Sequence, residues 1–322
     1  MMKPIRRMVP ALVMTALLPL QAGAADFRWD GFLDFTFMAI DDTAPSGRPS
    51  PTQSKFDISG ELDMNANLGN KVTSRIDFDL YNSAAADDSG RFEQAYVAWE
   101  SQQGIQLRGG QFNNPLSWEA EDAPDMHQIS HGQLYGIWNE TTALRGNNVI
   151  GVSVSGKTGV VTLTGAVLND LRQVDEKNSL MGLIDIKPDT HMDLKVGFTT
   201  QDTLLKTIVD INATYTQGLF MVGGEIMLPS EIIDMGVGVT GTYKFSDQVS
   251  GTLRFDNVSY DVNNVDDSRS MTVAVSYMLE KNLMVNAELR ANSTDNIPAA
   301  IFPDGNFILD GNQVQLELVA TF

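Results

Sequence analysis

The chain has 322 residues, 43% of them hydrophobic and 20% charged, with 22 basic and 41 acidic residues, a net charge of −19 and no cysteine. The absence of cysteine excludes a disulfide framework, a thiolate metal site and a cysteine nucleophile, and the acidic excess argues against binding to nucleic acid, which needs a basic face. The mean hydropathy of −0.12 excludes a polytopic helical membrane protein but permits a transmembrane β-barrel, whose strands are half polar.

The first 24 residues have the pattern of a secretory signal peptide. Lys3, Arg6 and Arg7 form a basic start, residues 9–20 form an apolar run, and residues 22–24 give the small-x-small cleavage pattern Ala-Gly-Ala. The alternative, a helical membrane anchor, needs about 20 apolar residues, and this run is too short. We therefore predict export through the inner membrane, with residues 1–24 removed and residues 25–322 forming the mature domain.

Apolar and polar residues alternate through most of the mature chain. In residues 54–68, Phe56, Ile58 and Leu62 alternate with polar residues such as Asp57 and Glu61. A period of two is typical of a strand with two different faces, and most such segments are long enough to cross a bilayer as tilted strands. We predict sixteen strands, at 27–39, 54–68, 71–82, 91–100, 104–112, 148–156, 158–168, 179–187, 191–199, 203–216, 218–228, 234–245, 249–260, 270–279, 283–293 and 312–322.

Long and short connectors alternate along the chain. The odd-numbered connectors include the long segments 40–53, 83–90, 113–147, 169–178, 261–269 and 294–311, although 200–202 and 229–233 are short. The even-numbered ones are tight turns at 69–70, 102–103, 157, 188–189, 217, 246–248 and 281–282. Long loops on one side and short turns on the other are typical of an outer-membrane barrel, and an even strand count places both termini on the periplasmic side.

The competing fold is a soluble β-sandwich or β-propeller, which also alternates and has regular turns. Long strands with one apolar face would leave many exposed edges in such a fold. Closure into a barrel removes the edges and turns the apolar face to lipid. We therefore predict an all-β, sixteen-stranded antiparallel transmembrane β-barrel in the outer membrane. Aromatic residues at strand ends are expected to form a periplasmic girdle: Trp99, Tyr215, Tyr243, Phe245, Tyr277 and Phe322.

Three segments resemble parts of Gram-negative porins. Residues 314–322 form an alternating strand with a terminal Phe322, which resembles the assembly signature of bacterial outer-membrane proteins. Residues 92–99 (FEQAYVAW) and 104–116 (GIQLRGGQFNNPL) resemble the fourth and fifth porin strands, and the second is most like the phosphate-selective group. The resemblance implies a homotrimer in outer-membrane lipid, assembled by the barrel-assembly machinery, with the third loop folded into the pore.

The connector 113–147 is the expected constriction loop. Uninterrupted loops of this length are usually functional, and Trp118, Tyr135 and Trp138 give it apolar surface for packing. An acidic surface loop that faces outward is the alternative. In general diffusion porins, a basic cluster on the early strands faces acids of the third loop. That resemblance implies a constriction of three basic and four acidic residues: Lys55, Arg75, Arg108, Glu119, Glu121, Asp122 and Asp125.

The predicted function is passive diffusion of small hydrophilic solutes and ions, with a weak preference for cations. Strand positions that share the polar face are mostly acidic, and a net-acidic lumen concentrates cations. Resemblance to the phosphate-selective group implies a ladder of arginines and lysines along the path. Here the bases on this face are instead mixed with acids: Asp57, Glu61, Asp63, Asp77, Asp79, Asp193, Asp210, Asp256, Glu288 and Glu317. A substrate-specific channel of the anion or phosphate type and a non-conducting barrel for anchoring or surface interaction stay as alternatives.

An enzyme is not expected. The only imidazoles are those of His127, His131 and His191. His127 and His131 are four residues apart, but the glutamate of a metalloprotease helix does not lie between them, so we expect two polar loop residues. Asp261, Asp266 and Asp267 lack the EF-hand pattern. No catalytic residue, cofactor or metal site is predicted.

Overall fold

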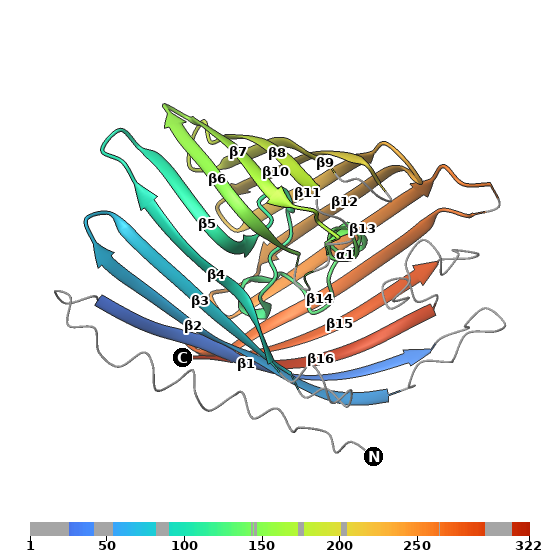
Figure 1. Cartoon of the computed structure of the whole chain (residues 1–322). Coiled ribbons are helices and arrows are strands. Elements are labelled where there is room, and N and C mark those ends of the chain that lie inside the picture. Colours follow the sequence, from blue (N-terminus) through green and yellow to red (C-terminus); the bar gives the residue numbers. More distant parts are fainter. Residues whose placement is uncertain are drawn as a thin grey trace, which may run out of the picture.

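A computed structural model describes residues 26–41, 54–81, 90–142, 144, 147–172, 177–200, 205–263, 265–293 and 311–322. The predicted signal peptide and nearly all of the predicted connectors 40–53, 83–90 and 294–311 lie outside these residues. Within them, sixteen strands form one closed antiparallel barrel (Figure 1). Each strand pairs with its neighbours along the chain, and the first strand pairs with the last. The predicted fold is therefore confirmed.

The strands β1 to β16 follow one another around the barrel, and two short helices lie between β5 and β6. The strands are β1 (Asp26–Asp41), β2 (Ser54–Gly69), β3 (Val72–Tyr81), β4 (Gly90–Glu100), β5 (Ile105–Asn113), β6 (Asn148–Thr158), β7 (Val161–Asn169), β8 (Asn178–Ile186), β9 (Met192–Thr200), β10 (Thr207–Gln217), β11 (Phe220–Pro229), β12 (Ile233–Lys244), β13 (Val249–Tyr260), β14 (Ser268–Glu280), β15 (Leu283–Ser293) and β16 (Gly311–Thr321). The helices are η1 (Ala123–Asp125) and α1 (Gln133–Thr141).

Two predicted tight turns are displaced along the chain. Lys157 lies inside β6 and Gln217 ends β10, and the turns follow at residues 159–160 and 218–219. Gly159 and Gly218 take φ values of 58° and 60°, in the left-handed region that glycine enters without steric cost. The turns therefore form at the glycines. The predicted strand start at residue 203 is also wrong, because β10 begins at Thr207.

The two faces of each strand meet different surroundings. On β13, Leu253 and Phe255 are 57% and 48% exposed, whereas Arg254 and Asp256 between them are 3% and 2% exposed. Arg254 contacts a segment inside the barrel, so the polar face points inward and the apolar face points outward. The exposed outer face gives the barrel an apolar surface that suits lipid.

Aromatic side chains lie on the outer face beside the tight turns. The six that were expected there are all at least 41% exposed: Trp99, Tyr215, Tyr243, Phe245, Tyr277 and Phe322. Among the described helices, neither is long and apolar enough to cross a membrane.

The two ends of the barrel sequence close the sheet. The backbone N–H of Gly31 donates to the carbonyl of Phe322 over 3.2 Å, and the N–H of Phe322 donates back over 3.0 Å. Further along the seam, Phe35 lies opposite Leu318. The last strand thus supplies the partner that β1 needs, and neither edge is left unpaired.

Candidate functional site: a loop packed inside the barrel

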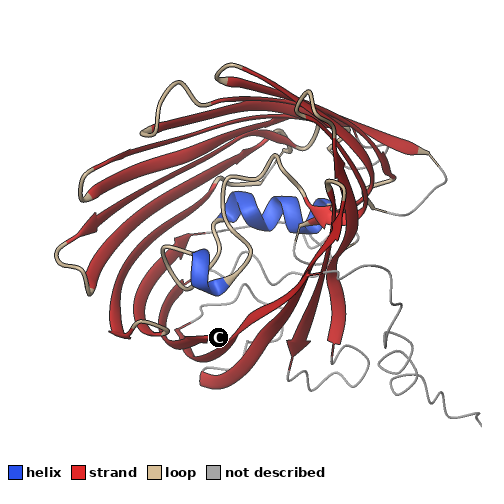
Figure 2. Ribbon diagram, turned by 90° about the vertical axis from the view of Figure 1, so that its left-hand side faces the viewer, coloured by secondary structure: helices blue, strands red, loops and turns tan. Residues whose placement is uncertain are grey.

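The segment 114–147, here called the inner loop, runs from β5 to β6. Figure 2 shows its two helices, α1 and η1, inside the ring of strands. Sequence reasoning predicts a packed loop but no helix there. In α1, Leu134, Ile137 and Trp138 lie at three- and four-residue spacing and are all buried, so the helix forms around a small apolar face that docks on the wall.

Two tryptophans attach the inner loop to strands β10 and β11. Trp138 is fully buried, and its Nε1 donates to Oε1 of Glu225 on β11 over 2.7 Å. The Nε1 of Trp118 donates to Oγ1 of Thr214 on β10 over 2.8 Å. A Cβ at Gly223 would lie only 2.3 Å from the Trp118 ring. The wall is thus shaped to receive this side chain, and the loop is fixed on that side of the lumen.

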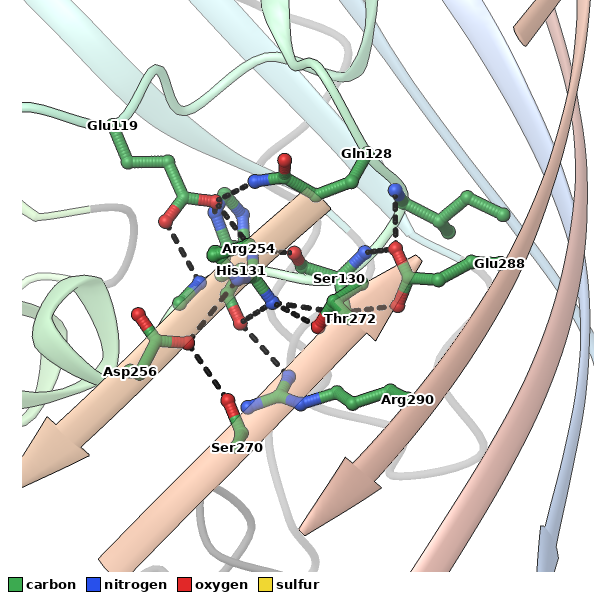
Figure 3. Close-up of polar contacts among 12 residues, drawn as sticks. Glu119, Gln128, Ser130, His131, Arg254, Asp256, Ser270, Thr272, Glu288 and Arg290 are labelled. Carbon is green, nitrogen blue, oxygen red and sulfur yellow. Dashed lines mark hydrogen bonds and ion pairs between the residues drawn. The ribbon is translucent and has the colours of Figure 1, made fainter. Parts of the chain in front are cut away.

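Two arginines of the wall hold the tip of the inner loop (Figure 3). Arg254 on β13 donates from Nη1 to the carbonyl of Ser130 over 2.6 Å and from Nη2 to that of His131 over 3.2 Å. Arg290 on β15 donates to the same His131 carbonyl over 2.8 Å. These bonds satisfy the backbone of a turn that lies inside the barrel, where few other donors are available.

Two carboxylates complete this contact, which we call the loop anchor (Glu119, Ser130, His131, Arg254, Glu288 and Arg290). Glu119 accepts from the N–H of Gly132 over 2.7 Å and lies 3.5 Å from Nη1 of Arg254. Glu288 accepts from the N–H groups of Ile129 and Ser130 over 2.8 and 3.0 Å, and from the Ser130 hydroxyl. Arg254 and Glu119 thus form an ion pair, and Arg290 and Glu288 are satisfied by hydrogen bonds to the loop.

The loop anchor perturbs the pKa of Glu119. Burial alone raises the pKa of this carboxyl, but the hydrogen bond with His131 and the charge of Arg254 outweigh burial and hold the pKa below its ordinary value. Because the pKa is lower in the folded chain, the contacts of Glu119 stabilise the fold above the ordinary value of 4.5. That stabilisation is lost as the pH falls through the lowered pKa.

We therefore expect acid to weaken the loop anchor. The unfolding temperature of the native chain should exceed that of Glu119→Gln at about pH 6, and this difference should shrink toward about pH 3 as Glu119 takes up a proton. The difference in unfolding temperature is measured from the heat-dependent gel mobility of both barrels at a series of pH values. Asp125→Asn, at an exposed loop position, is the control and should keep the native profile. A constant difference across the range would contradict the assignment.

The other side of the inner loop faces β16 and β1 to β4 across a cavity of about 190 Å³. We call it the acidic cavity. Its lining contains seven carboxylates and, among the described residues, no lysine or arginine: Asp34, Glu61, Asp79, Glu93, Glu121, Asp122 and Glu317. Burial raises the pKa of Glu121 well above its ordinary value and raises that of Asp122. Both walls of this gap therefore present carboxyl groups, and burial disfavours the simultaneous ionisation of all of them.

Comparisons with known proteins address the architecture. No family model matches, and no curated protein matches by sequence. Among solved structures, an anion-selective porin from Comamonas acidovorans is 12% identical, with a TM-score of 0.69 and coverage of 93% of this chain and 100% of that one. The outer membrane channel DcaP of Acinetobacter baumannii is 14% identical (TM-score 0.68, coverage 94% and 98%). OmpF of Salmonella typhi, solved with daunomycin, is 8% identical (TM-score 0.73, coverage 92% and 97%). The chain has the fold of the Gram-negative porins.

In this porin fold, the predicted constriction residues lie in several places. Arg75 pairs with three carboxylates of its own wall, at 2.6 Å to Asp77, 3.3 Å to Asp63 and 3.8 Å to Glu61. Its charge is therefore shared within an acidic stretch of β2 and β3, at the edge of the acidic cavity. Lys55 pairs with Asp57 over 2.9 Å, and both side chains are 46% exposed.

Arg108 and the loop acids divide between the two sides of the inner loop. The guanidinium of Arg108 lies over the ring of Tyr96, 4.7 Å from its centroid. Glu119 belongs to the loop anchor, while Glu121 and Asp122 line the acidic cavity. Asp125 is exposed in η1. The structure thus brings Arg75 near Asp122, and it places Glu119 against β13.

Sequence reasoning missed Arg254 and Arg290 in the porin lumen. The sequence does carry a signal for Arg254. This residue alternates with the apolar Leu253 and Phe255, and it therefore shares the lumen-facing side of the strand with Asp256. Glu93 was missed as well, although it alternates with Phe92 in the segment that resembles a porin strand. The alternation along a strand shows which side chains point into the lumen, but it does not show which of them contact the inner loop. These three residues therefore could not be singled out from the sequence.

The two loop histidines lie in different environments. The ring of His131 stacks on Tyr135 with 3.8 Å between centroids, and its Nδ1 lies 3.3 Å from Glu119. His127 is exposed. His191, beside a tight turn, contacts the carbonyl of Thr216 over 2.8 Å.

Proposed function

We propose that the protein is an outer-membrane porin through which small hydrophilic solutes and ions diffuse passively, with a preference for cations. One observation carries this proposal: the inner loop fills part of a closed barrel and leaves a gap lined by carboxylates on both sides. An acidic constriction raises the local concentration of cations and repels anions. A soluble β-protein would bury its apolar face in a core and expose its polar face to water, which is the reverse of the arrangement in this barrel.

The outer membrane is the location that fits this surface. The barrel presents an apolar band with aromatic side chains near the tight turns, which suits lipid and its interfaces. By resemblance, the chain assembles as a homotrimer and reaches the membrane through the barrel-assembly machinery, which reads the last strand with Phe322. Nothing in the proposal requires a cofactor or a catalytic residue.

The charge arrangement favours cations over the alternative of an anion or phosphate channel. In the described lumen, Arg75 and Arg254 are both held by carboxylates, so the charge of these two arginines is shared with acids. The solved Comamonas porin is anion-selective, but at 12% identity the likeness shows the fold alone. A non-conducting barrel is the other alternative, and it would need the inner loop to close the lumen fully.

Recording from the purified protein in planar bilayers tests these readings. We expect stepwise openings, and a reversal potential of the sign that cations produce under a potassium chloride gradient. Glu317→Gln, which removes a charge from the acidic cavity, should reduce this potential, while Asp247→Asn in an exposed turn should leave it unchanged. A reversal potential of opposite sign would support an anion channel, and silence would support a closed barrel.

A further inference from the structure

Three carboxylates from three separate elements converge in the acidic cavity. Glu61 on β2, Glu93 on β4 and Asp122 on the inner loop each offer one oxygen, and these oxygens all lie within 4.8 Å of one another. Two of the three ligands come from the wall and one comes from the loop. Anything that binds all three therefore joins the loop to the wall.

Two carboxyl groups of the acidic cavity, those of Glu93 and Glu121, have buried oxygens without a hydrogen-bond partner. Glu93 is 1% exposed, and neither of its oxygens accepts a hydrogen bond. Glu121, which lines the same cavity, has a buried Oε2 that also accepts none. A buried carboxylate without a hydrogen bond or a counter-charge is costly, by several kcal/mol in general. The cavity thus holds unsatisfied acceptors aimed at a common space.

The neighbouring arginine does not supply the missing charge. Arg75 lies 3.8 Å from Oε1 of Glu61, but it lies closer to Asp63 and Asp77, at 3.3 and 2.6 Å. Its charge is therefore already shared by those two acids. Arg91 on β4 pairs with Asp79 over 2.7 Å. No ion pair joins Glu93 to an arginine or lysine of the described residues, and a cation from solution would supply that charge.

We propose that Glu61, Glu93 and Asp122 bind a calcium ion that bridges the inner loop to β2 and β4. Calcium prefers carboxylate oxygens at about 2.4 Å, so two ligands on opposite sides of the ion are about 4.8 Å apart. The three oxygens lie within 4.8 Å of one another, so one calcium ion can reach all of them. Magnesium demands a strict octahedron and gives up its waters reluctantly, so it suits carboxylates on three separate elements less well.

The bound ion would change the proposed channel in two ways, and this part of the inference rests on the proposed function. It would fix the inner loop to β2 and β4, whereas the loop anchor fixes it to β13 and β15. It would also cancel part of the negative charge of the acidic cavity, so calcium would lower both the conductance for monovalent cations and the preference for them. Binding itself does not require conduction.

Titration calorimetry of the full barrel in detergent, washed with a chelator, tests the site directly. With calcium chloride at neutral pH we expect one site with a dissociation constant of about 0.1–1 mM, as in extracellular calcium modules, and weaker binding of magnesium chloride. Glu93→Gln and Asp122→Asn should each weaken binding at least about tenfold. Glu100→Gln, on the exposed end of β4, and Asp125→Asn, on the exposed part of the loop, are the matched controls.

Heat-dependent gel mobility checks that each variant forms a barrel, and bilayer recording with and without calcium separates the two proposals. Binding that is lost in Glu93→Gln and Asp122→Asn but kept in both controls supports the site. If the native protein gave no heat of calcium binding, or if all variants gave the same heat, the site would be refuted. The unpartnered carboxyl groups would then be explained by protons that they share. Conduction by a protein that gives no calcium heat would refute the site alone, whereas calcium binding in a silent barrel would refute the channel alone.

Discussion

Replacement of Arg254 by methionine should release the tip of the inner loop and lower the free energy of unfolding by about 3–5 kcal/mol. Only 2% of the Arg254 side chain is exposed, and it donates to the carbonyls of Ser130 and His131. It also lies 3.5 Å from Glu119 and 3.2 Å from Asp256. Methionine fills much of the volume but leaves two buried carboxylates without their cation, and that is the main cost.

Hydrogen exchange of the loop amides and denaturant unfolding in detergent measure this effect, and bilayer recording shows its consequence. We expect faster exchange at residues 128–132 and a larger, noisier conductance. Arg269→Met is the matched control, because Arg269 is 62% exposed and its ion pair with Asp267 spans 3.6 Å. Exposed pairs of this kind contribute about 0–1 kcal/mol. Native exchange and conductance in Arg254→Met would refute the loop anchor.

A double variant tests whether the arginine and the carboxylate act as one unit. Combining Arg254→Met with Glu119→Gln removes the uncompensated charge of Glu119 together with its partner. The combined loss of stability should therefore be smaller than the sum of the two single losses. Additive losses would mean that the two side chains hold the loop independently.

The strands could be predicted because the physical signal is local. In a barrel, each strand has one face toward lipid and one toward water, so every pair of neighbouring residues reports its orientation. Leu253, Arg254 and Phe255 show this alternation without any knowledge of the fold. Turn positions were less certain, because Lys157 and Gln217 are polar enough to turn while the neighbouring glycines reach the required φ at lower cost.

The partners inside the lumen could not be predicted, because parity gives the face of a residue but not its height or its place around the barrel. Glu119 and Arg254 are 135 residues apart in the chain. Their contact depends on the path of the inner loop, which local alternation does not determine. The resemblance to porins placed the loop acids opposite the early strands. Asp122 does face the early strands across the acidic cavity, whereas Glu119 contacts Arg254 on β13.

The structure places many of the excess acidic residues inside the barrel. Many acids point inward, and several lie together in the acidic cavity, while the outer face is apolar. The opposite side of the inner loop is held by Arg254 and Arg290. The loop is thus attached to β13 and β15 through Arg254 and Arg290, and it faces carboxyl groups of β2 and β4 across the acidic cavity. A cation bound in that cavity would act mainly on the contact with β2 and β4.

Replacement of Trp138 by alanine should have a second large effect, a loss of about 3–5 kcal/mol in the stability with which α1 is docked. Trp138 is fully buried between α1 and the wall, and its ring volume would be left as a cavity. The change also removes the donor to Glu225, whose carboxylate is buried on β11. Hydrogen exchange of the α1 amides and the lifetime of channel openings measure the result.

Two further variants separate the causes. Trp138→Phe keeps most of the ring but removes the Nε1 donor, so it should lose only about 1–3 kcal/mol, the cost of an unsatisfied buried acceptor. Trp29→Ala, at a position that is 56% exposed on the outer face, should leave α1 exchange unchanged. Native exchange in Trp138→Ala would mean that the hydrogen bonds of the loop anchor are sufficient to hold the helix. If alanine and phenylalanine had equal effects, the bond to Glu225, rather than packing, would dock the helix.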